Sequence, residues 1–428
     1  MRKSVIVICL LITLLLALPL LGGCAKEEPP TPAPPTPVGK PVVKVGFLCD
    51  YTGPVGHGRY MQLVIEEGTL SCAAKYNPLP VDIEILPYDT KYDPAKGIEG
   101  YKYLAERGIK VCLGLYAQDA ETIYRIAPEY KIPLMAGGPS TASLIPPGWV
   151  FSAYALYQPI YIRTLKWISE NHWDYEAEGR KPKIGVSAWR RTMAVEATEG
   201  IEAYCEANPD KFEFVSAELV PVGTVSFAAE VDRLKGCDYI LVVEMAAIMV
   251  PFVKEAQAKG FRGKYVIGHT IQPWFLWTES IGKEALDGTI MLSGAGGWYT
   301  DDSDGAREMM PFIDKYYPDP REKYLRTHAT ETSSTFPCFL PAIEAIRIAA
   351  EDVGADNITG EAIYKAFQKL DFEPKDYGMD GLSGPYKTSA TERVCMNYIR
   401  IYTYSAAKDT FLPQTDWLSL EGMWPIKK

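Results

Sequence analysis

Glycines and a proline follow an apolar run near the start of the chain, in the stretch VKVGFLCDYTGPVGHG. A glycine-rich turn between a strand and a helix often binds a nucleotide phosphate, because free backbone N–H groups point at the anion. Gly53, Gly56 and Gly58 are spaced GxxGxG, however, whereas a dinucleotide pyrophosphate requires GxGxxG. Asp82 and Glu84 lie too far along the chain, within a strand, to bind the ribose. The turn is therefore not predicted to bind a dinucleotide.

Histidine and cysteine, which often carry protons or bind metals, occur without a catalytic pattern. None of the four histidines lies in a GxSxG, HExxH or paired-carboxylate context; they are His57, His172, His269 and His328. The nine cysteines include no CxxC pair, and most lie in apolar runs, as small hydrophobic residues do. We therefore expect no catalytic residue, no metal and no cofactor.

The first residues have the pattern of an export signal. Arg2 and Lys3 precede an apolar run, Val5–Leu21, that is short for a membrane span. The run ends in Leu-Gly-Gly-Cys24, which resembles the bacterial lipobox and implies cleavage before Cys24 with diacylglycerol on its thiol. The alternative is a plain signal anchor with a chance cysteine. The pattern predicts a signal peptide over residues 1–23, and a lipidated Cys24 with a proline-rich linker over residues 24–41.

Charge and hydropathy restrict the range of partners. The net charge is −10 at pH 7 and the lysines and arginines do not cluster, so no nucleic-acid partner is expected. No later segment is long and apolar enough to span a bilayer. We expect an extracytoplasmic protein, in the periplasm or at the cell surface, that is linked to a bacterial membrane by the lipid on Cys24.

Alternating strand-like and helical patterns must position whatever site the chain contains. Apolar runs of strand length alternate with helical periodicity from Val43 onward, and the same order restarts after Tyr154. This order predicts an α/β fold of two doubly wound units, each a parallel sheet covered by helices on both faces. Ligands of such units bind beyond the carboxyl ends of the strands. The loops expected to face a ligand are residues 50–58, 116–119, 137–143, 187–193, 244–247 and 269–277.

Five motifs in a fixed order resemble one known family. They are VKVGFLCDYTGPVGHG, YDTKYDPAKGIEGYKYL, VCLGLYAQDA, YKIPLMAGGPSTASL and YILVVEMAAIMVPFVKEAQAKGF, and the resemblance extends from about Val42 to Thr410. The chain resembles the type I periplasmic solute-binding proteins of ABC transporters, in particular the branched-chain amino-acid (Leu/Ile/Val)-binding family in its lipoprotein form. The resemblance implies an ABC permease as partner and two lobes that close on a small molecule. We expect a monomer.

The resemblance also implies three crossovers between the lobes. They are expected near Phe151–Tyr157, Asp287–Ser293 and Tyr377–Gly384. The N-terminal lobe would then contain residues 42–154 plus 290–380, and the C-terminal lobe residues 155–289 plus 381–428.

In this family a ligand carboxylate is bound by backbone N–H groups and hydroxyls of the first lobe. The positions that match here are Gln118, where the family usually has serine, and the loop Gly138, Pro139 and Ser140. Ser140 can cap a short helix whose free N–H groups favour an anion, which makes it the main candidate for the carboxylate anchor. Without the resemblance, the segment GGPST (residues 137–141) would be interpreted as a turn followed by a helix cap and not as a binding site.

The second lobe departs from the amino-acid binders. The loop HTIQPWFLW, which includes Thr270, carries no fixed negative charge that could bind an ammonium group. Glu244 either supplies that charge from the neighbouring strand or is paired with a cation at the edge of the cleft. We expect a carboxylate-bearing, partly apolar ligand, an aromatic or branched acid or an amino acid, with no obligatory amine. Apolar walls and further contacts are expected from Tyr51, Thr52, Tyr116, Trp189, Met193, Met245 and Trp274.

Two other functions remain open. A binding protein that presents its ligand to a sensor or receptor, instead of a permease, would have the same fold and the same loops. A lipid-anchored enzyme is the weaker alternative, because no nucleophile, base and orienting group occur in a recognisable pattern.

Overall fold

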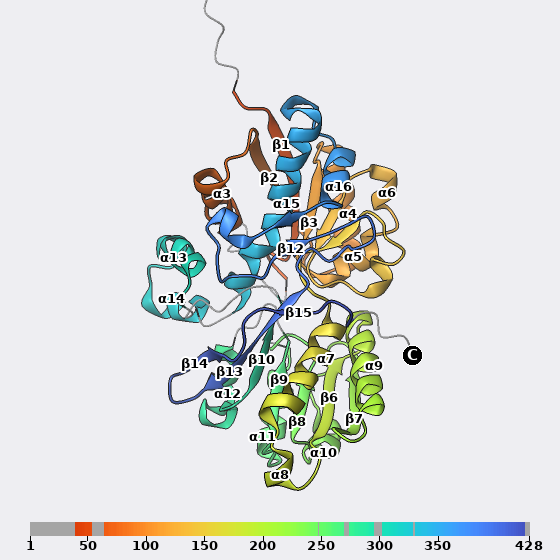
Figure 1. Cartoon of the computed structure of the whole chain (residues 1–428), viewed down its shortest axis with the longest axis vertical. Coiled ribbons are helices and arrows are strands. Elements are labelled where there is room, and N and C mark those ends of the chain that lie inside the picture. Colours follow the sequence, from red (N-terminus) through yellow and green to blue (C-terminus); the bar gives the residue numbers. More distant parts are fainter. Residues whose placement is uncertain are drawn as a thin grey trace, which may run out of the picture. The chain divides into compact units, whose positions relative to one another are not determined.

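The computed structural model describes residues 39–53, 64–246, 248–268, 274–294, 302–327 and 330–423 (Figure 1). Nearly all of them belong to one compact unit, Pro41–Lys428. The expected signal peptide, Cys24 and most of the expected linker lie outside the described residues. Within the described ranges, no helix has both the length and the hydropathy that crossing a membrane requires.

The first sheet is fully parallel. Its five strands, in the spatial order β2-β1-β3-β4-β5, are β1 (Val42–Cys49), β2 (Asp82–Asp89), β3 (Val111–Gly114), β4 (Leu134–Ala136) and β5 (Val150–Ser152). The elements between these strands are η2 (Val64–Thr69), α3 (Leu70–Tyr76), α4 (Pro94–Glu106), α5 (Ala117–Ile123), α6 (Ala127–Tyr130) and η3 (Thr141–Ser143). Such an order places β1 and β3 side by side at the point where the winding of the chain reverses.

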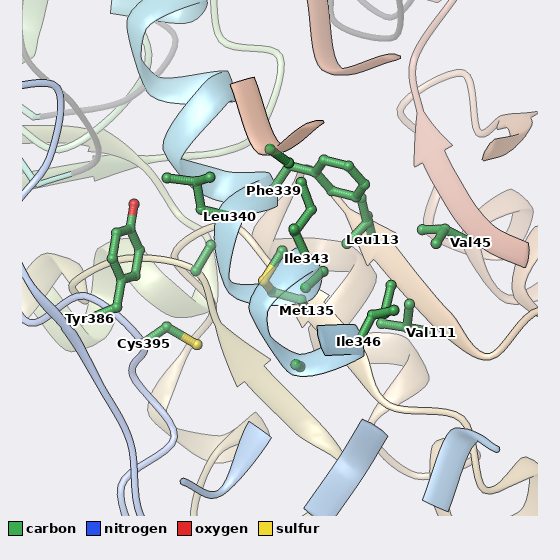
Figure 2. Close-up of a cluster of buried hydrophobic side chains, with 14 of the residues drawn as sticks. Val45, Val111, Leu113, Met135, Phe339, Leu340, Ile343, Ile346, Tyr386 and Cys395 are labelled. Carbon is green, nitrogen blue, oxygen red and sulfur yellow. The ribbon is translucent and has the colours of Figure 1, made fainter. Parts of the chain in front are cut away.

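Helices from late in the sequence complete the core on one face of this sheet. Figure 2 shows Phe339, Ile343 and Ile346 of α15 (Thr330–Val353) directed at side chains of the sheet, among them Val111 of β3. The other elements of this late segment are α13 (Asp304–Tyr316), α14 (Pro320–Thr327), η6 (Ala355–Asn357), α16 (Gly360–Phe367), β11 (Asp371–Phe372), η7 (Pro374–Tyr377) and β12 (Tyr386–Lys387). A second cluster, which includes Leu48 and residues of α4 and α5, covers the opposite face.

The second sheet repeats the same winding and then extends it. The parallel strands run in the order β7-β6-β8-β9-β10, and β13 and β14 continue the sheet in antiparallel pairing. They are β6 (Lys183–Trp189), β7 (Glu213–Val220), β8 (Tyr239–Val242), β9 (Lys264–Ile267), β10 (Ile290–Ser293), β13 (Tyr398–Ser405) and β14 (Thr410–Pro413), with β15 (Leu418–Ser419) beside β13. The helical elements here are α7 (Tyr157–Trp167), η4 (Ile168–His172), α8 (Tyr175–Glu178), α9 (Thr192–Ala207), α10 (Ala228–Leu234), α11 (Val250–Ala258), α12 (Phe275–Ile281) and η5 (Glu284–Leu286).

Each sheet has an apolar cluster on either face, so the fold is two doubly wound α/β layers, as the sequence predicts. We call the part built on the first sheet the first lobe and the part built on the second sheet the second lobe. The clusters of the second lobe include residues of α7 and α9 on one face and of α10, α11 and α12 on the other.

The lobe boundaries differ from the expected ones at two places. The segment expected to begin the return to the first lobe, at residue 290, instead forms β10, which pairs with β9 and β13 in the second sheet. Residues expected beyond the last crossover, at 381 and after, still pack in the first core, among them Tyr386 and Cys395. The reason is physical: buried apolar strands do not reveal from sequence alone which sheet they join.

Candidate functional site

A cavity that combines apolar walls with charged groups lies where strand ends of both sheets meet. Its volume is about 440 Å³, which suits a small organic molecule. The described residues that line it belong to the segments that follow the strands from β2 to β8, including the first residues of the helices after them. They are Tyr92, Pro94, Leu115, Tyr116, Ala117, Gln118, Glu121, Gly137, Tyr154, Tyr157, Arg190, Arg191, Thr192, Met193, Val222, Glu244 and Met245.

Strand order explains why the cavity forms there. Within each sheet, the winding reverses between two neighbouring strands, β1 and β3 in the first lobe and β6 and β8 in the second. The helices that follow such a pair diverge to opposite faces and leave a crevice at the strand ends. Tyr116 follows β3, Arg191 follows β6 and Glu244 follows β8, so both crevices contribute side chains to one cavity.

Two tyrosines form the first-lobe wall, and one of them has an unusual backbone. The rings of Tyr92 and Tyr116 meet edge to face, with centroids 4.9 Å apart. Tyr92 has φ +56° and Lys91 before it has φ +51°, in the left-handed region that few non-glycine residues adopt. The turn ends where the Asp93 side chain accepts the N–H of Ala95 and caps α4. Local strain of this kind tends to persist where it places a functional side chain.

The short helix α5 supplies the polar part of the first-lobe wall. Tyr116 precedes its first turn, and the backbone N–H of Tyr116 donates to Asp119 Oδ2 at 3.3 Å. Burial raises the pKa of Asp119 to about 7. Gln118 and Glu121 of the same helix line the cavity. Burial also raises the pKa of Glu121, while hydrogen bonds with Ser140 and Thr192 lower it in part.

The second lobe contributes a positively charged side chain, Arg191, which is paired with the carboxylate of Glu244. Arg191 Nε lies 3.3 Å from Glu244 Oε2, and the Glu244 side chain is only 1% exposed. Burial raises the pKa of Glu244, and the positive charge of Arg191 opposes that rise. Arg191 Nη1 also donates to the hydroxyl of Tyr92 across the cavity at 2.6 Å. The guanidinium lies 5.1 Å from the centroid of the Tyr92 ring and 5.5 Å from that of Trp189, so aromatic faces and a carboxylate fix its orientation.

The loop around Ser140, which the sequence predicts to bind a ligand carboxylate, interacts with carboxylates of the protein itself. The backbone N–H of Thr141, at the start of η3, donates to Glu196 Oε2 of α9 at 2.8 Å. Ser140 is buried and interacts with the Glu121 carboxylate. The loop does bind anions, as a helix N-terminus should, but in this conformation the anions are side chains of the chain itself.

The structure brings together four of the residues singled out from the sequence: Tyr116, Gln118, Met193 and Met245 all line the cavity. Gly138, Pro139 and Ser140 follow the lining residue Gly137 but are not among the described lining residues, and all three are buried.

The remaining residues lie elsewhere. Thr52 donates its hydroxyl to Asp89, and the Tyr51 N–H does the same, so both stabilise the turn after β1. The Trp189 indole donates to the Thr224 carbonyl at 3.3 Å and does not line the cavity. Trp274 is 2% exposed and packs in the core of the second lobe against Tyr404 and Phe411. Thr270 lies outside the described residues.

Several lining residues are not on the sequence-based list of contacts. Arg191 was detectable in principle, because it lies just beyond a strand end, two positions after Trp189. Of the two roles that the sequence leaves open for Glu244, the structure shows pairing with a cation, Arg191. The sequence does not predict Tyr92 as a lining residue. Its position in the wall depends on a left-handed backbone at Lys91 and Tyr92, a conformation that neither residue type favours. Among the described residues, no group of three or more His, Cys, Asp or Glu side chains is arranged to hold a metal ion.

Comparisons with known proteins agree with this architecture. A family model described as "Periplasmic binding protein" matches residues 42–409. A comparison with curated proteins gave no match.

Solved structures of similar fold share little sequence with the chain. A branched-chain amino-acid ABC transporter protein from Thermus thermophilus with bound valine is 18% identical, with a TM-score of 0.73, over 90% of this chain and 98% of that one. A solute-binding protein from R. palustris in complex with 4-hydroxybenzoate is 15% identical, with a TM-score of 0.69, over 90% and 98%. A fatty acid ABC transporter substrate-binding protein from Thermomonospora curvata is 17% identical, with a TM-score of 0.69, over 90% and 94%.

Proposed function

The chain belongs to the periplasmic binding protein family, and from that premise we propose that it captures a small organic acid as the solute-binding component of an ABC importer. One observation carries the proposal: a cavity of about 440 Å³ is lined by strand-end residues of both lobes. A ligand that contacts both lobes favours the closed arrangement over the open one, because it gains its full set of contacts only when they meet. Binding, and not bond making, is then the activity.

The charges in the cavity support a carboxylate as the polar group of the ligand. Arg191 has five N–H donors, and the contacts with Tyr92 and Glu244 use only part of them. A planar guanidinium suits a carboxylate, which it can bind through two parallel hydrogen bonds. We therefore propose Arg191 as the carboxylate anchor. Ser140, the anchor favoured by sequence, is a weaker candidate because Glu121 already interacts with it.

The walls support an apolar body and do not require an amine. Tyr116, Tyr154 and Tyr157 line the cavity with Met193 and Met245, and flat or adaptable apolar surfaces of this kind suit an aromatic ring or a branched chain. Arg191 already balances the charge of Glu244, so that carboxylate does not require an ammonium group from the ligand.

Titration calorimetry against leucine, glutamate and a series of aromatic and branched acids tests this function. We expect the acids without an amine to bind, with Arg191→Met weakening all of them. Micromolar binding of leucine together with no response to any acid that lacks an amine would contradict the proposed ligand class.

We further propose that the mature protein is a monomer anchored by lipid on Cys24, outside the cytoplasm of a bacterium. Cys24→Ser removes the thiol that would be acylated, so we expect that variant in the soluble extracytoplasmic fraction with its ligand binding intact. Recovery of the variant in membranes, as for the unaltered protein, would contradict the lipid anchor.

A further inference from the structure

The cavity opens to solvent at a mouth that its exposed lining residues define. The described lining residues that are buried include Leu115, Tyr116, Tyr154 and Met193. Those that are exposed, and therefore surround the mouth, are Pro94, Arg190, Thr192 and Val222. Val222 is 58% exposed although its side chain is purely apolar. It therefore presents to water, at the cavity, a surface that an apolar ligand could cover.

Strand order places Val222 beside Arg191. β7 is the edge strand of the second sheet, and β6 and β8 follow it in that order. Val222, Arg191 and Glu244 each lie two residues beyond the end of β7, β6 and β8, respectively. Because neighbouring strands are about 4.8 Å apart, Val222 and Glu244 flank Arg191 on opposite sides. The mouth at Val222 is therefore next to the residue that is proposed to bind the carboxylate.

Hydrogen bonds fix the turn that carries Val222. The backbone N–H and the hydroxyl of Thr224 both donate to the carbonyl of Pro221, at 3.1 and 2.7 Å. Gly223 has φ +88°, the left-handed conformation that the third residue of a type II turn requires. The indole N–H of Trp189 donates to the Thr224 carbonyl and so links the turn to the end of β6. Val222 occupies a corner of this turn, so the turn sets its position at the mouth.

We propose that Val222 determines the length of the acid that the cavity prefers. The carboxylate of the ligand binds Arg191, and the outer end of its apolar chain packs against Val222. A shorter acid leaves Val222 in water, whereas an acid that reaches the mouth buries apolar surface, which favours binding about fourfold for each CH₂ group covered. The ligand class is therefore a carboxylic acid whose apolar part extends to the mouth of the cavity. This inference rests on the proposed function and adds a specificity-determining residue to it.

Acids that differ only in length test the inference without altering the protein. Titration calorimetry measures the dissociation constants of the straight-chain acids from butanoate to decanoate. We expect the affinity to rise by about fourfold per CH₂ group until the chain covers Val222. Beyond that length the affinity should level off, because further CH₂ groups extend into solvent and bury no additional surface.

Two matched substitutions then assign the effect to one side chain. In Val222→Ser, the longest acids should bind roughly fivefold more weakly, whereas butanoate should bind within about twofold of its affinity for the unaltered protein. Val225 is 74% exposed on the same segment and is not among the described lining residues, so Val225→Ser is the control and should keep the affinity at every length. Both side chains are exposed, so the two variants should unfold at the same temperature as the unaltered protein.

Two failures can be told apart. If the acids bind but Val222→Ser leaves the dependence on length unchanged, or if Val225→Ser weakens the long acids to the same extent, the role of Val222 is wrong and the proposed function stands. If no acid of any length or class binds the unaltered protein, the proposed function is wrong and the role of Val222 falls with it.

Discussion

The carboxylate of Glu196 accepts a hydrogen bond from the backbone N–H of Thr141 at 2.8 Å, and the two residues belong to different lobes. Glu196 lies on α9 of the second lobe, whereas Thr141 begins η3 beside the first sheet. The contact places a negative charge of the chain at a helix N-terminus, as a bound anion would be placed. This hydrogen bond links the two lobes through groups of the chain itself.

Glu196→Ala should therefore shift the ligand-free protein toward the open arrangement. A charge-assisted hydrogen bond of this type contributes about 1–2 kcal/mol, or roughly tenfold in the ratio of closed to open forms. Small-angle X-ray scattering of the free protein should show a larger radius of gyration for the variant. Glu199→Ala, at an exposed position of the same helix, is the control and should scatter like the unaltered protein.

The pair of Arg191 and Glu244 predicts separate effects on stability and binding. Arg191→Met leaves the 1%-exposed Glu244 carboxylate without its cation, so the free energy of unfolding should fall by about 3 kcal/mol. Adding Glu244→Gln removes the buried charge and should recover most of that loss in urea unfolding, while affinity for acids stays low in titration calorimetry. A double variant that recovers affinity as well would show that Arg191 does not bind the ligand. Arg190→Met, at an exposed neighbouring position, should change stability by less than about 0.5 kcal/mol.

Asp119 predicts a pH dependence of stability. Burial raises the pKa of Asp119 from 3.8 to about 7, so the folded protein holds a proton that the unfolded chain releases between these values. The resulting stabilisation is fully present below about pH 4 and is lost as the pH rises to about 7. Asp119→Asn keeps an acceptor for the Tyr116 N–H and cannot ionise. The stability of the unaltered protein minus that of Asp119→Asn should therefore decrease across this window in urea unfolding. A flat difference would contradict the raised pKa.

Gly360 marks a close approach of two backbones. A Cβ at this first position of α16 would lie 2.2 Å from the carbonyl oxygen of Lys131, an atom that cannot move aside cheaply. Gly360→Ala should therefore lower the free energy of unfolding by about 1–3 kcal/mol, as overpacking does. A Cβ at Gly236 would meet nothing within 4 Å and its φ is not left-handed, so Gly236→Ala should have no destabilising effect. Thermal unfolding of both variants compares the two sites directly.

The order of strands and helices was accessible from sequence because each element follows a clear period. β2, β6 and β8, for example, lie where the apolar runs predict them, and the alternation with helices indicates parallel sheets. The sequence does not predict which sheet the strands near the crossovers join. β10, for example, pairs with β13, which lies about a hundred residues later, and only tertiary packing selects that partner.

Position after a strand end predicts the residues that line the cavity better than residue type does. Tyr116 and Met245 follow strand ends and do line the cavity. Trp189 and Trp274 also lie near strand ends, but the indole of the first bonds to a neighbouring loop and that of the second fills the core. A large aromatic ring is stabilised by any apolar environment, so its presence in a loop does not decide between a cavity wall and a core.

The interleaving of the lobes has a consequence for proteolysis. The segment after β7 exposes Val222 and Val225, which are 58% and 74% accessible, and is therefore an accessible place for a protease to cut. A cut there leaves β6 in one fragment and β8, its hydrogen-bonded neighbour, in the other. The first sheet would belong to the leading fragment, and its covering helix α15 to the trailing one. The clipped chain should run as two bands under denaturing conditions and still migrate as a single species in its native state.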